Sequence, residues 1–484
     1  EMKTPEYWIN QMPEPDKVRM SAEQIQQYNT KTLAKLSAEG TMYDLPAMQN
    51  YSAAQIATMI PKAETPEDEL YDKDGNLIQD NETYFAEAVA NGTVTASKLL
   101  PGVCIQRTDM KSLPFTDIVT WDPEDLPYID TLQQTAVLLN DPVVIAGYSV
   151  DKKWAYVYTD YYQGWVKSSA VVPFDVDTLG KELAWSEWQD WTTFHNDQDE
   201  FLIITANKVE LEIPGVSDKP QLTMGVKLKV AAESPSAYTI VLPIEGADGT
   251  FDITNVDLPK DDRVHLGYME LTGRNLINQV FKCQGDVYGW GGTLDSRDCS
   301  ALVMDLYRCF GFKMPRDTDP QEAAVCKKLD FNDLDEAQRI ELLKRVPVGC
   351  PLYLHNHTIT YLGQVDGKPY GISATSSFLI NDVNYTVWNT LVSPLDVEKY
   401  NKTGTWLSSL TSALLFGDEI QPQPDPKPTP PIPGEDEGAK SPSDGNFGNL
   451  DADTSDTNLA YFAFFTLLAS AVALPTLRLI LRNK

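Results

Sequence analysis

The stretch YGWGGTLDSRDCS, residues 288–300, is the part of the sequence on which the fold assignment depends. Its glycines let the backbone turn sharply and let a ligand approach it closely. The apolar run CSALVMDLYRCF, residues 299–310, follows and is closed by Gly311, which predicts a central buried helix. The turn therefore either leads into an ordinary buried helix or presents a thiol for chemistry at the start of that helix.

Cys299 is the thiol in question. If Asp298 caps the helix, Cys299 lies at the helix N-terminus, where free N–H groups and the helix dipole favour a thiolate. A structural cysteine after a glycine-rich turn would explain the local sequence equally well. The six cysteines of the chain are too sparse for a disulfide scaffold, and they form no CxxC pair. Three of them lie in apolar surroundings and are predicted to be plain buried thiols, namely Cys309, Cys326 and Cys350.

A nucleophilic thiol needs a base, and the chain contains only four histidines. His195 and His265 lie in polar segments and are predicted to be bystanders. His355 and His357 stand two apart in CPLYLHNHTITYLG, residues 350–363, so an uninterrupted core strand would put both on one face. Such a pair also permits a zinc site, but no third and fourth ligand stand nearby at suitable spacing. A cysteine with a strand histidine is the favoured constellation.

The composition indicates a globular chain of several domains. Its 484 residues exceed what one hydrophobic core normally serves, so about three or four domains are expected. A hydrophobic content of 42% with 10% aromatic residues argues against wholesale disorder. The formal net charge is −31, and no basic stripe offsets it. Such a chain repels polyanions, which excludes a nucleic-acid partner.

The C-terminal part of the sequence predicts a membrane anchor. The run LAYFAFFTLLASAVALPTL, residues 459–477, carries no charge and would span about 28 Å as a helix at ~1.5 Å per residue. Basic residues follow it and acidic residues precede it, which predicts a cytoplasmic tail and an exported body whose signal peptide has been removed. A buried C-terminal helix is the alternative. Residues 421–456 are rich in Pro, Gly, Ser and Asp and read as an extended spacer.

The body of the chain changes character near residue 100. Before that point it reads as helical and irregular, and Ser21 with Gln24 forms a capping box at the start of an amphipathic helix. Two strand-rich regions follow, which would fit two small antiparallel barrels. Their expected strands include VVIAGY (143–148), WAYVY (154–158), GWV (164–166), LTMGVKLKV (222–230) and YTIVLPIEGADGTF (238–251).

A resemblance to a known family rests on three segments: DVYGWGG (286–292), RDCSALVMDLYRCFGFKMPRDT (297–318) and GCPLYLHNHTITYLGQVDGKPYGI (349–372). In this order they resemble the NlpC family of papain-like cysteine endopeptidases, which cut peptidoglycan stem peptides. Segments further upstream resemble the paired bacterial SH3-like barrels that precede some of these peptidases, after an N-terminal clip. These segments are RTDMKSLPFTD (107–117), LQQTA (132–136), DKKWAYVYTDYYQGWV (151–166) and LTMGVKL (222–228).

The resemblance implies a multidomain α+β chain with a papain-like catalytic domain. The expected division is an N-terminal clip (1–102), a first SH3-like barrel (103–180), a second (181–263), a cysteine peptidase domain (264–418), a spacer (419–457) and a transmembrane anchor with a basic tail (458–484). Proline spacer, membrane helix and basic tip also resemble the wall-anchoring tails of Gram-positive surface proteins. Because the sortase site in DTSDTN (453–458) lacks its Leu-Pro and Gly, a retained membrane anchor is favoured over covalent wall attachment.

Site residues follow from the same resemblance, position by position. Cys299 matches the nucleophile and His357 the general base, while Tyr288 matches the tyrosine that lines the oxyanion site. Asp298 and Ser300 match residues that hold the free amino end of the substrate. His355 has no counterpart and is expected to be structural.

One position departs from the family pattern. The third member of the triad, usually His and sometimes Asn or Gln, follows the GKPY turn, and Ser373 stands there in GISATSS. A serine hydroxyl can accept the imidazole N–H, but it is shorter than those side chains and uncharged. The sequence therefore predicts a slow peptidase.

The sequence as a whole leads to a membrane-anchored, extracytoplasmic cysteine endopeptidase that cleaves the bond between γ-D-glutamate and a diamino acid in wall stem peptides. No metal or organic cofactor is implied, and no motif specifies an oligomeric state. The alternative is a wall-binding protein whose peptidase domain has weakened or lost its activity, a hypothesis that depends on Ser373. An acyltransferase that uses the same thiol is a third possibility.

Overall fold

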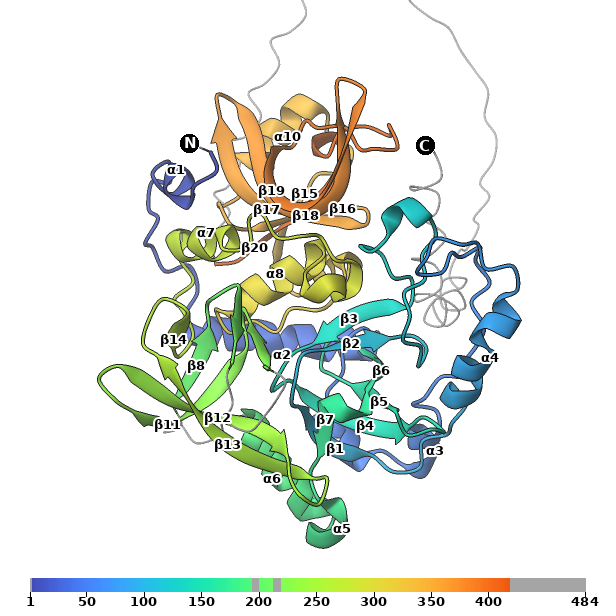
Figure 1. The fold of residues 1–484 in the computed structure, drawn as a ribbon. Coiled ribbons are helices and arrows are strands. Elements are labelled where there is room, and N and C mark those ends of the chain that lie inside the picture. Colours follow the sequence, from blue (N-terminus) through green and yellow to red (C-terminus); the bar gives the residue numbers. More distant parts are fainter. Residues whose placement is uncertain (1, 194–199, 212–218, 418–484) are drawn as a thin grey trace, which may run out of the picture.

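The computed structural model describes residues 2–193, 200–211 and 219–417. Figure 1 shows three β-sheet regions arranged around one central helix, α8 (Cys299–Arg308). One sheet lies above this helix, and two further sheets lie below it, to the lower right and lower left of the view. Helix α8 is therefore the element that all three regions approach.

The N-terminal segment is helical and packs onto the regions that follow. It contains α1 (Pro5–Ile9), α2 (Ala22–Ala38), α3 (Ala53–Ala57) and α4 (Asn81–Gly92). The predicted capping box of α2 is confirmed, because the Gln24 N–H donates to Ser21 Oγ and the Ser21 N–H donates to the Gln24 side chain. Tyr28 of α2 packs against Phe312 and Phe416, so α2 shares the core that surrounds α8.

The first sheet is antiparallel, with strand order β3-β2-β6-β5-β4-β1-β7. The strands predicted from the sequence at 143–148, 154–158 and 164–166 are confirmed as β4, β5 and β6. The bounds are β1 (Leu100–Cys104), β2 (Thr108–Lys111), β3 (Gln133–Val137), β4 (Pro142–Tyr148), β5 (Trp154–Tyr158), β6 (Gln163–Lys167) and β7 (Val171–Pro173). Helices α5 (Val176–Leu179) and α6 (Lys181–Thr193) follow.

The second sheet has the order β13-β12-β11-β8-β14, with β9 and β10 as a separate pair. The run 222–230 was expected as one strand, but Gly225 interrupts it with φ +86°. A Cβ at this glycine would lie 2.6 Å from Arg308 Cβ, so the turn is set by the close approach of α8. The bounds are β8 (Phe201–Ile204), β9 (Lys208–Glu210), β10 (Gln221–Thr223), β11 (Lys227–Glu233), β12 (Ala237–Glu245), β13 (Phe251–Pro259) and β14 (Val264–Leu266).

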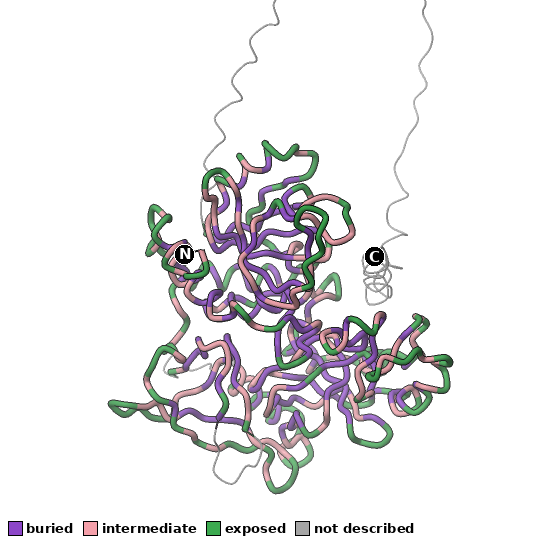
Figure 2. The backbone as a smooth tube through the Cα atoms, turned by 45° about the horizontal axis from the view of Figure 1, so that its top comes forward, coloured by how far each residue is buried: buried purple, intermediate pink, exposed green. Residues whose placement is uncertain are grey.

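The third region packs α7 (Gly273–Phe281) and α8 against a sheet of order β15-β20-β16-β17-β18-β19. The predicted buried helix is confirmed, and apart from Arg308 all its residues are buried. Figure 2 shows buried backbone through the middle of the molecule and exposed residues at outer loops. The remaining bounds are α9 (Thr318–Glu322), α10 (Glu336–Leu343), β15 (Lys327–Asp330), β16 (Pro351–Leu354), β17 (His357–Val365), β18 (Lys368–Ile380), β19 (Val383–Pro394) and β20 (Leu410–Leu415).

The uninterrupted strand expected over 350–363 is wrong. Strand β16 ends at Leu354 and β17 begins at His357, and these two residues face each other across a tight hairpin. Asn356 takes φ +60° in the turn, a conformation that asparagine tolerates better than most residues. His355 is therefore exposed in the turn and does not share a strand face with His357. Within the described residues no group of three His, Cys, Asp or Glu side chains is arranged to hold a metal.

Three predictions concern residues that the structure does not describe. They are the spacer (419–457), the transmembrane anchor with its basic tail (458–484) and the role of His195. Among the residues that the structure does describe, no helix is long and apolar enough to cross a bilayer.

Candidate active site

The start of α8 has the cap that the sequence predicts. The Ala301 N–H donates to Asp298 Oδ1 at 2.9 Å, so Asp298 is the N-cap residue. Cys299 is the first residue of the helix, and only 8% of its surface is exposed. The backbone N–H groups of Ser300 and Thr358 act on its sulfur and lower the pKa of the thiol. The thiol therefore lies where α8 meets the beginning of β17.

The glycine-rich turn folds back onto this cap. Gly291 and Gly292 take φ +60° and +91°, and the Gly291 N–H donates to Asp298 Oδ2 at 2.9 Å. Gly289 has no room for a Cβ, which would overlap the carbonyl oxygen of Thr293. The glycines are thus required by the path of the chain around the helix start.

His357 lies opposite Ser373, as the sequence predicts for two residues of one site. Its Nε2 is 3.2 Å from Ser373 Oγ, and Ser373 is 1% exposed on the neighbouring strand β18. The imidazole also packs against Trp406, with ring centroids 5.1 Å apart. Because Nε2 contacts Ser373, Nδ1 is the ring nitrogen that remains for contact with another group.

Burial dominates the electrostatics of both groups. It raises the pKa of the Cys299 thiol to about 12, the nearby Asp298 carboxylate raises that pKa further, and hydrogen bonds from the backbone with the Arg316 charge oppose the rise. It lowers the pKa of His357 to about 4, against an opposing effect of Asp298. Burial thus raises the pKa of the Cys299 thiol more than the helix terminus lowers it. Both shifts favour the neutral thiol and the neutral imidazole.

A pH dependence of stability follows from His357. Because its folded-state pKa of about 4 lies below the ordinary 6.5, the unfolded chain binds a proton at higher pH than the folded chain does. Stability should therefore fall as pH drops from 6.5 to 4, by at most about 3 kcal/mol from this group. Denaturant unfolding of wild type and His357→Gln at pH 7 and pH 4.5 measures this contribution. The variant should lose less stability than wild type, and equal losses would contradict the assignment.

An aromatic wall stands beside the thiol. Tyr288 packs against Trp388 of β19 with centroids 5.6 Å apart, and Trp388 stacks on Tyr128 of the first region at 4.7 Å and 8°. The Trp290 N–H donates to the Tyr128 carbonyl at 3.0 Å, which ties this wall to the glycine turn. Burial and the neighbouring Cys299 raise the Tyr288 pKa well above 10, so its hydroxyl stays protonated and can donate. Tyr128 and Trp388 were not predicted, since they are far apart in sequence.

A buried arginine holds the two residues that flank the cysteine. Arg316 is 2% exposed, forms an ion pair with Asp298 and donates to the Ser300 hydroxyl. Its Nε donates to Thr135 Oγ1 of β3 at 3.0 Å, which links this group to the first sheet. Its Nη1 lies 3.2 Å from Asp317 Oδ1, and the Asp317 side chain is 48% exposed.

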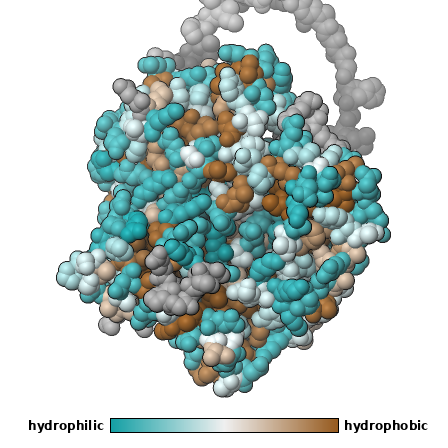
Figure 3. Space-filling model, in the orientation of Figure 1, coloured by the Kyte–Doolittle hydropathy of each residue, from teal (hydrophilic) through white to brown (hydrophobic). Residues whose placement is uncertain are grey.

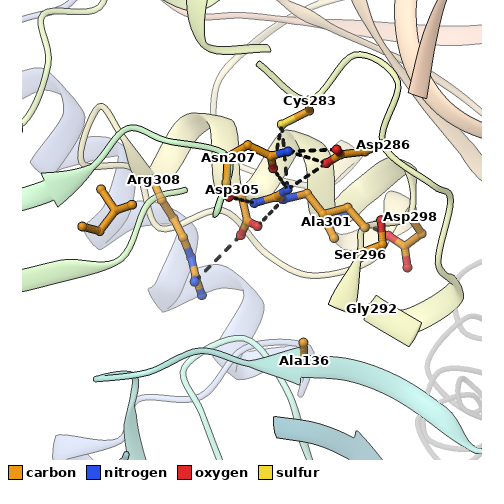
Figure 4. A network of polar contacts seen from close by, with 12 residues as sticks. Ala136, Asn207, Cys283, Asp286, Gly292, Ser296, Asp298, Ala301, Asp305 and Arg308 are labelled. Carbon is orange, nitrogen blue, oxygen red and sulfur yellow. Dashed lines mark hydrogen bonds and ion pairs between the residues drawn. The ribbon is translucent and has the colours of Figure 1, made fainter. Parts of the chain in front are cut away.

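A second buried arginine precedes the cap and reaches the other sheet region. Arg297 donates to Asp305 of α8 at 2.7 Å and to Asn207 Oδ1, also at 2.7 Å. Asn207 in turn donates to Asp286 at 2.8 Å. Figure 4 shows Asn207, Asp286 and Cys283 close together near Asp305, and all four contact Arg297. Arg297 and Arg316 therefore connect the start of α8 to the second and the first sheet region respectively.

The first sheet contributes directly to the walls of the site. Arg107 forms a 2.6 Å ion pair with Asp295, and Gln133 Nε2 donates to the Gly291 carbonyl at 3.1 Å. Arg297 and Arg316 belong to the motifs RDCS and MPRDT, but those motifs do not show which distant residues the two arginines bind. Their partners depend on how the sheets pack on α8.

Two family models match segments of the chain. Residues 285–363 match the model of the NlpC/P60 family, and residues 121–167 match that of an SH3 domain of the SH3b1 type. No curated protein is significantly similar to the chain.

Solved structures match the chain as well. An NlpC/P60 endopeptidase from Photobacterium damselae subsp. piscicida shares 18% identity over 86% of this chain and 97% of its own, with a TM-score of 0.65. An NlpC/P60 family protein from Bacillus cereus ATCC 10987 shares 16% identity over 66% of this chain and 100% of its own, with a TM-score of 0.43. The chain therefore carries a domain of the NlpC/P60 family, a family of cysteine peptidases, behind an SH3 domain of the SH3b1 type.

Proposed function

We propose that this protein is a cell-wall endopeptidase that hydrolyses the amide bond between γ-D-glutamate and a diamino acid in peptidoglycan stem peptides. The observation that carries the proposal is the juxtaposition of the helix-start thiol of Cys299 with β17, whose first residue, His357, contacts Ser373. Cys299 and His357 belong to the segment that matches the NlpC/P60 family, and Ser373 lies ten residues beyond its end.

The chemistry begins from the neutral pair. In the tautomer that carries its proton on Nε2, His357 donates to Ser373 Oγ, and Nδ1 then accepts the proton of the Cys299 thiol as the sulfur attacks the amide carbonyl carbon. The Tyr288 hydroxyl and a backbone N–H at the start of α8 stabilise the oxygen anion of the tetrahedral intermediate. The C–N bond then breaks, and the imidazolium gives its proton to the leaving amine.

Hydrolysis of the acyl-enzyme completes the cycle. A water molecule loses its proton to His357 and attacks the thioester carbonyl. The C–S bond breaks, the thiol regains a proton from the imidazolium, and the peptide acid leaves. Neither half of the cycle requires a metal or an organic cofactor.

Recognition of the peptide would involve the residues around the cap. The Asp298 carboxylate is engaged by Arg316 and by two backbone N–H groups, so we propose that it acts by positioning Ser300 and the start of α8. The Ser300 hydroxyl and the partly exposed Asp317 carboxylate would then meet the free amino end of the peptide. The wall formed by Tyr128 and Trp388 would restrict the cleft to short stem peptides.

We also propose the setting of the enzyme and its division into domains. The catalytic domain would comprise residues 264–418, after a clip (1–102) and two SH3-like barrels (103–180 and 181–263). The segments 419–457 and 458–484 would hold it at the outer surface of the membrane, within reach of the wall. The charge pattern around the apolar run 459–477 supports this orientation.

Replacement of Ser373 by alanine should slow turnover by roughly tenfold, about 1.4 kcal/mol of activation barrier. The hydroxyl orients the imidazole through the 3.2 Å contact, and it supports the imidazolium as the thiol loses its proton. Single-turnover kinetics on one stem peptide measure the effect. Ser393→Ala is a matched control, because Ser393 is a buried serine of the adjacent strand whose hydroxyl has no partner among the described residues. Equal turnover rates for the two variants would contradict a role of Ser373 in the active site.

Activity on two kinds of substrate tests the proposed function. Stem peptides with a free N-terminal alanine should release a new amino group when incubated with the protein, whereas the same peptides still joined to glycan should react much more slowly. Equal cleavage rates on free and glycan-linked peptides would contradict the proposal that the cleft admits only short stem peptides. Wall binding without release of any amine would favour the alternative of a weakened wall-binding protein.

A further inference from the structure

A second candidate site is a cleft beside α7. It is an open hollow with a volume of about 810 Å³, which is large enough for a small ligand. The N-terminal segment, the end of the second sheet and α7 form its walls. Figure 3 shows this part of the surface, over α7 and β14, as mainly hydrophilic. The residues used below are Lys3, Asp262, His265, Asn278, Lys282 and Gln284.

Two amide side chains of this cleft are available to a ligand. Asn278 and Gln284 lie on α7 and just after it, both half-buried. Neither side-chain amide hydrogen-bonds to another described residue. An amide offers two donor hydrogens and one acceptor oxygen, which is the complement of a peptide group. A half-buried pair of such groups favours a ligand that contains amide bonds.

The charges of the cleft have both signs. Lys282 Nζ donates to the carbonyl oxygens of Thr205 at 3.0 Å and Asp262 at 3.2 Å, which leaves one of its three N–H groups for a ligand. Lys3 is a second cation, and the exposed carboxylate of Asp262 is the one acidic side chain in the lining. The exposed His265 adds a ring that bonds the Gly267 carbonyl through Nδ1 at 3.0 Å, so Nε2 remains.

The presence of both positive and negative side chains in the cleft favours some charged ligands over others. A polyanion is bound by many cations, but the cleft has a surplus of only one, two lysines against Asp262, in a chain of net charge −31. A carboxylate beside an ammonium group matches both signs at once. The chemistry of the lining therefore fits a short zwitterionic peptide better than a phosphate polymer.

The cleft is close to the site already described. The Gly285 N–H at its edge donates to the Thr390 carbonyl of β19 at 2.8 Å, and the Tyr288 N–H donates to Trp388 of the same strand at 2.9 Å. One strand thus borders the catalytic wall and the edge of the second cleft.

We propose that the α7 cleft is a second, non-catalytic binding site for a short zwitterionic peptide that carries a diamino acid and a free carboxylate. This inference rests on the proposed function, which supplies peptides of that chemistry as substrates. Lys282 and Lys3 would bind the carboxylate, Asp262 the ammonium group, and the two amides the peptide bonds between them. Such a site would retain a second wall peptide beside the enzyme.

Calorimetric titration of the full-length Cys299→Ala protein with L-alanyl-γ-D-glutamyl-L-lysine tests the proposal without turnover. Two peptides should bind per chain. Asn278→Trp, which fills the cleft, should remove one of them, and Gln284→Ala should weaken that one by about tenfold. Gln27→Trp on the exposed face of α2 is the matched control and should leave both. Thermal unfolding of each variant verifies that it is folded.

The outcomes separate this inference from the proposed function. One peptide per chain, unaffected by Asn278→Trp, would overturn the second site and leave catalytic binding intact. One peptide that is lost in Asn278→Trp would support the second site and count against the proposed substrate. No binding at all would overturn the inference. Binding of poly(glycerol phosphate) that is sensitive to Asn278→Trp, without binding of the tripeptide, would also overturn it.

Discussion

Replacement of Cys299 by alanine is expected to abolish peptide hydrolysis and to leave the unfolding midpoint nearly unchanged. Loss of the nucleophile of such a catalytic unit costs on the order of 10⁴-fold or more in rate. The substitution removes one sulfur atom that lies at the edge of the core, where 8% of the residue is exposed, so little packing is lost. The measurement is the rate of stem-peptide cleavage alongside a thermal unfolding curve.

Cys326→Ala is the matched control for this experiment. It removes a partly buried thiol that packs against the same core as α8 but takes no part in the chemistry. Its rate per folded molecule should equal that of wild type. A Cys299→Ala protein that retains activity within tenfold of wild type would refute the nucleophile.

The second large effect concerns Arg316. Replacement by methionine removes the partner of Asp298 and leaves a buried carboxylate without its ion pair, which typically costs 3–5 kcal/mol. The start of α8 should also lose its fixed position, so kcat should fall while KM changes less. Urea unfolding and steady-state kinetics measure the two effects. Arg274→Met is the control, because its ion pair with Asp16 is exposed and should contribute little.

A double variant separates pairing from simple loss of packing. If the ion pair is what matters, Asp298→Asn combined with Arg316→Met should destabilise less than the sum of the single changes. Additive losses would show that the two residues act independently. In that case Arg316 would not be a positioning residue for the nucleophile.

Local patterns of the sequence predict the parts of the fold that local physics determines. The helix at 299–310 follows from its continuous apolar run, its Asp298 cap follows from residue type, and β4 and β5 follow from their β-branched and aromatic residues. Burial in the core stabilises these elements as the sequence pattern indicates. The His357–Ser373 contact was predicted on another basis, the resemblance to a known family, and not from a local pattern.

Other features depend on contacts that no local pattern contains. The hairpin turn at Asn356 interrupts a run that reads as one strand. The turn is only two residues long, so it hardly changes the strand pattern in the sequence. Gly225 breaks a second run because α8 packs against it. Trp388 reaches Tyr288 over 100 residues of sequence, and Arg316 meets Thr135 of another sheet over 181 residues. Tertiary packing alone brings these groups together.

The central claim is the identity of the bond that is cut, and mass spectrometry of one defined peptide tests it most directly. The wild-type protein is incubated with L-alanyl-γ-D-glutamyl-L-lysyl-D-alanine, and the products are identified by mass. We predict two products, L-alanyl-D-glutamate and L-lysyl-D-alanine, and neither of them with Cys299→Ala. Cleavage at any other bond, or the same products from the Cys299→Ala protein, would contradict the proposed function.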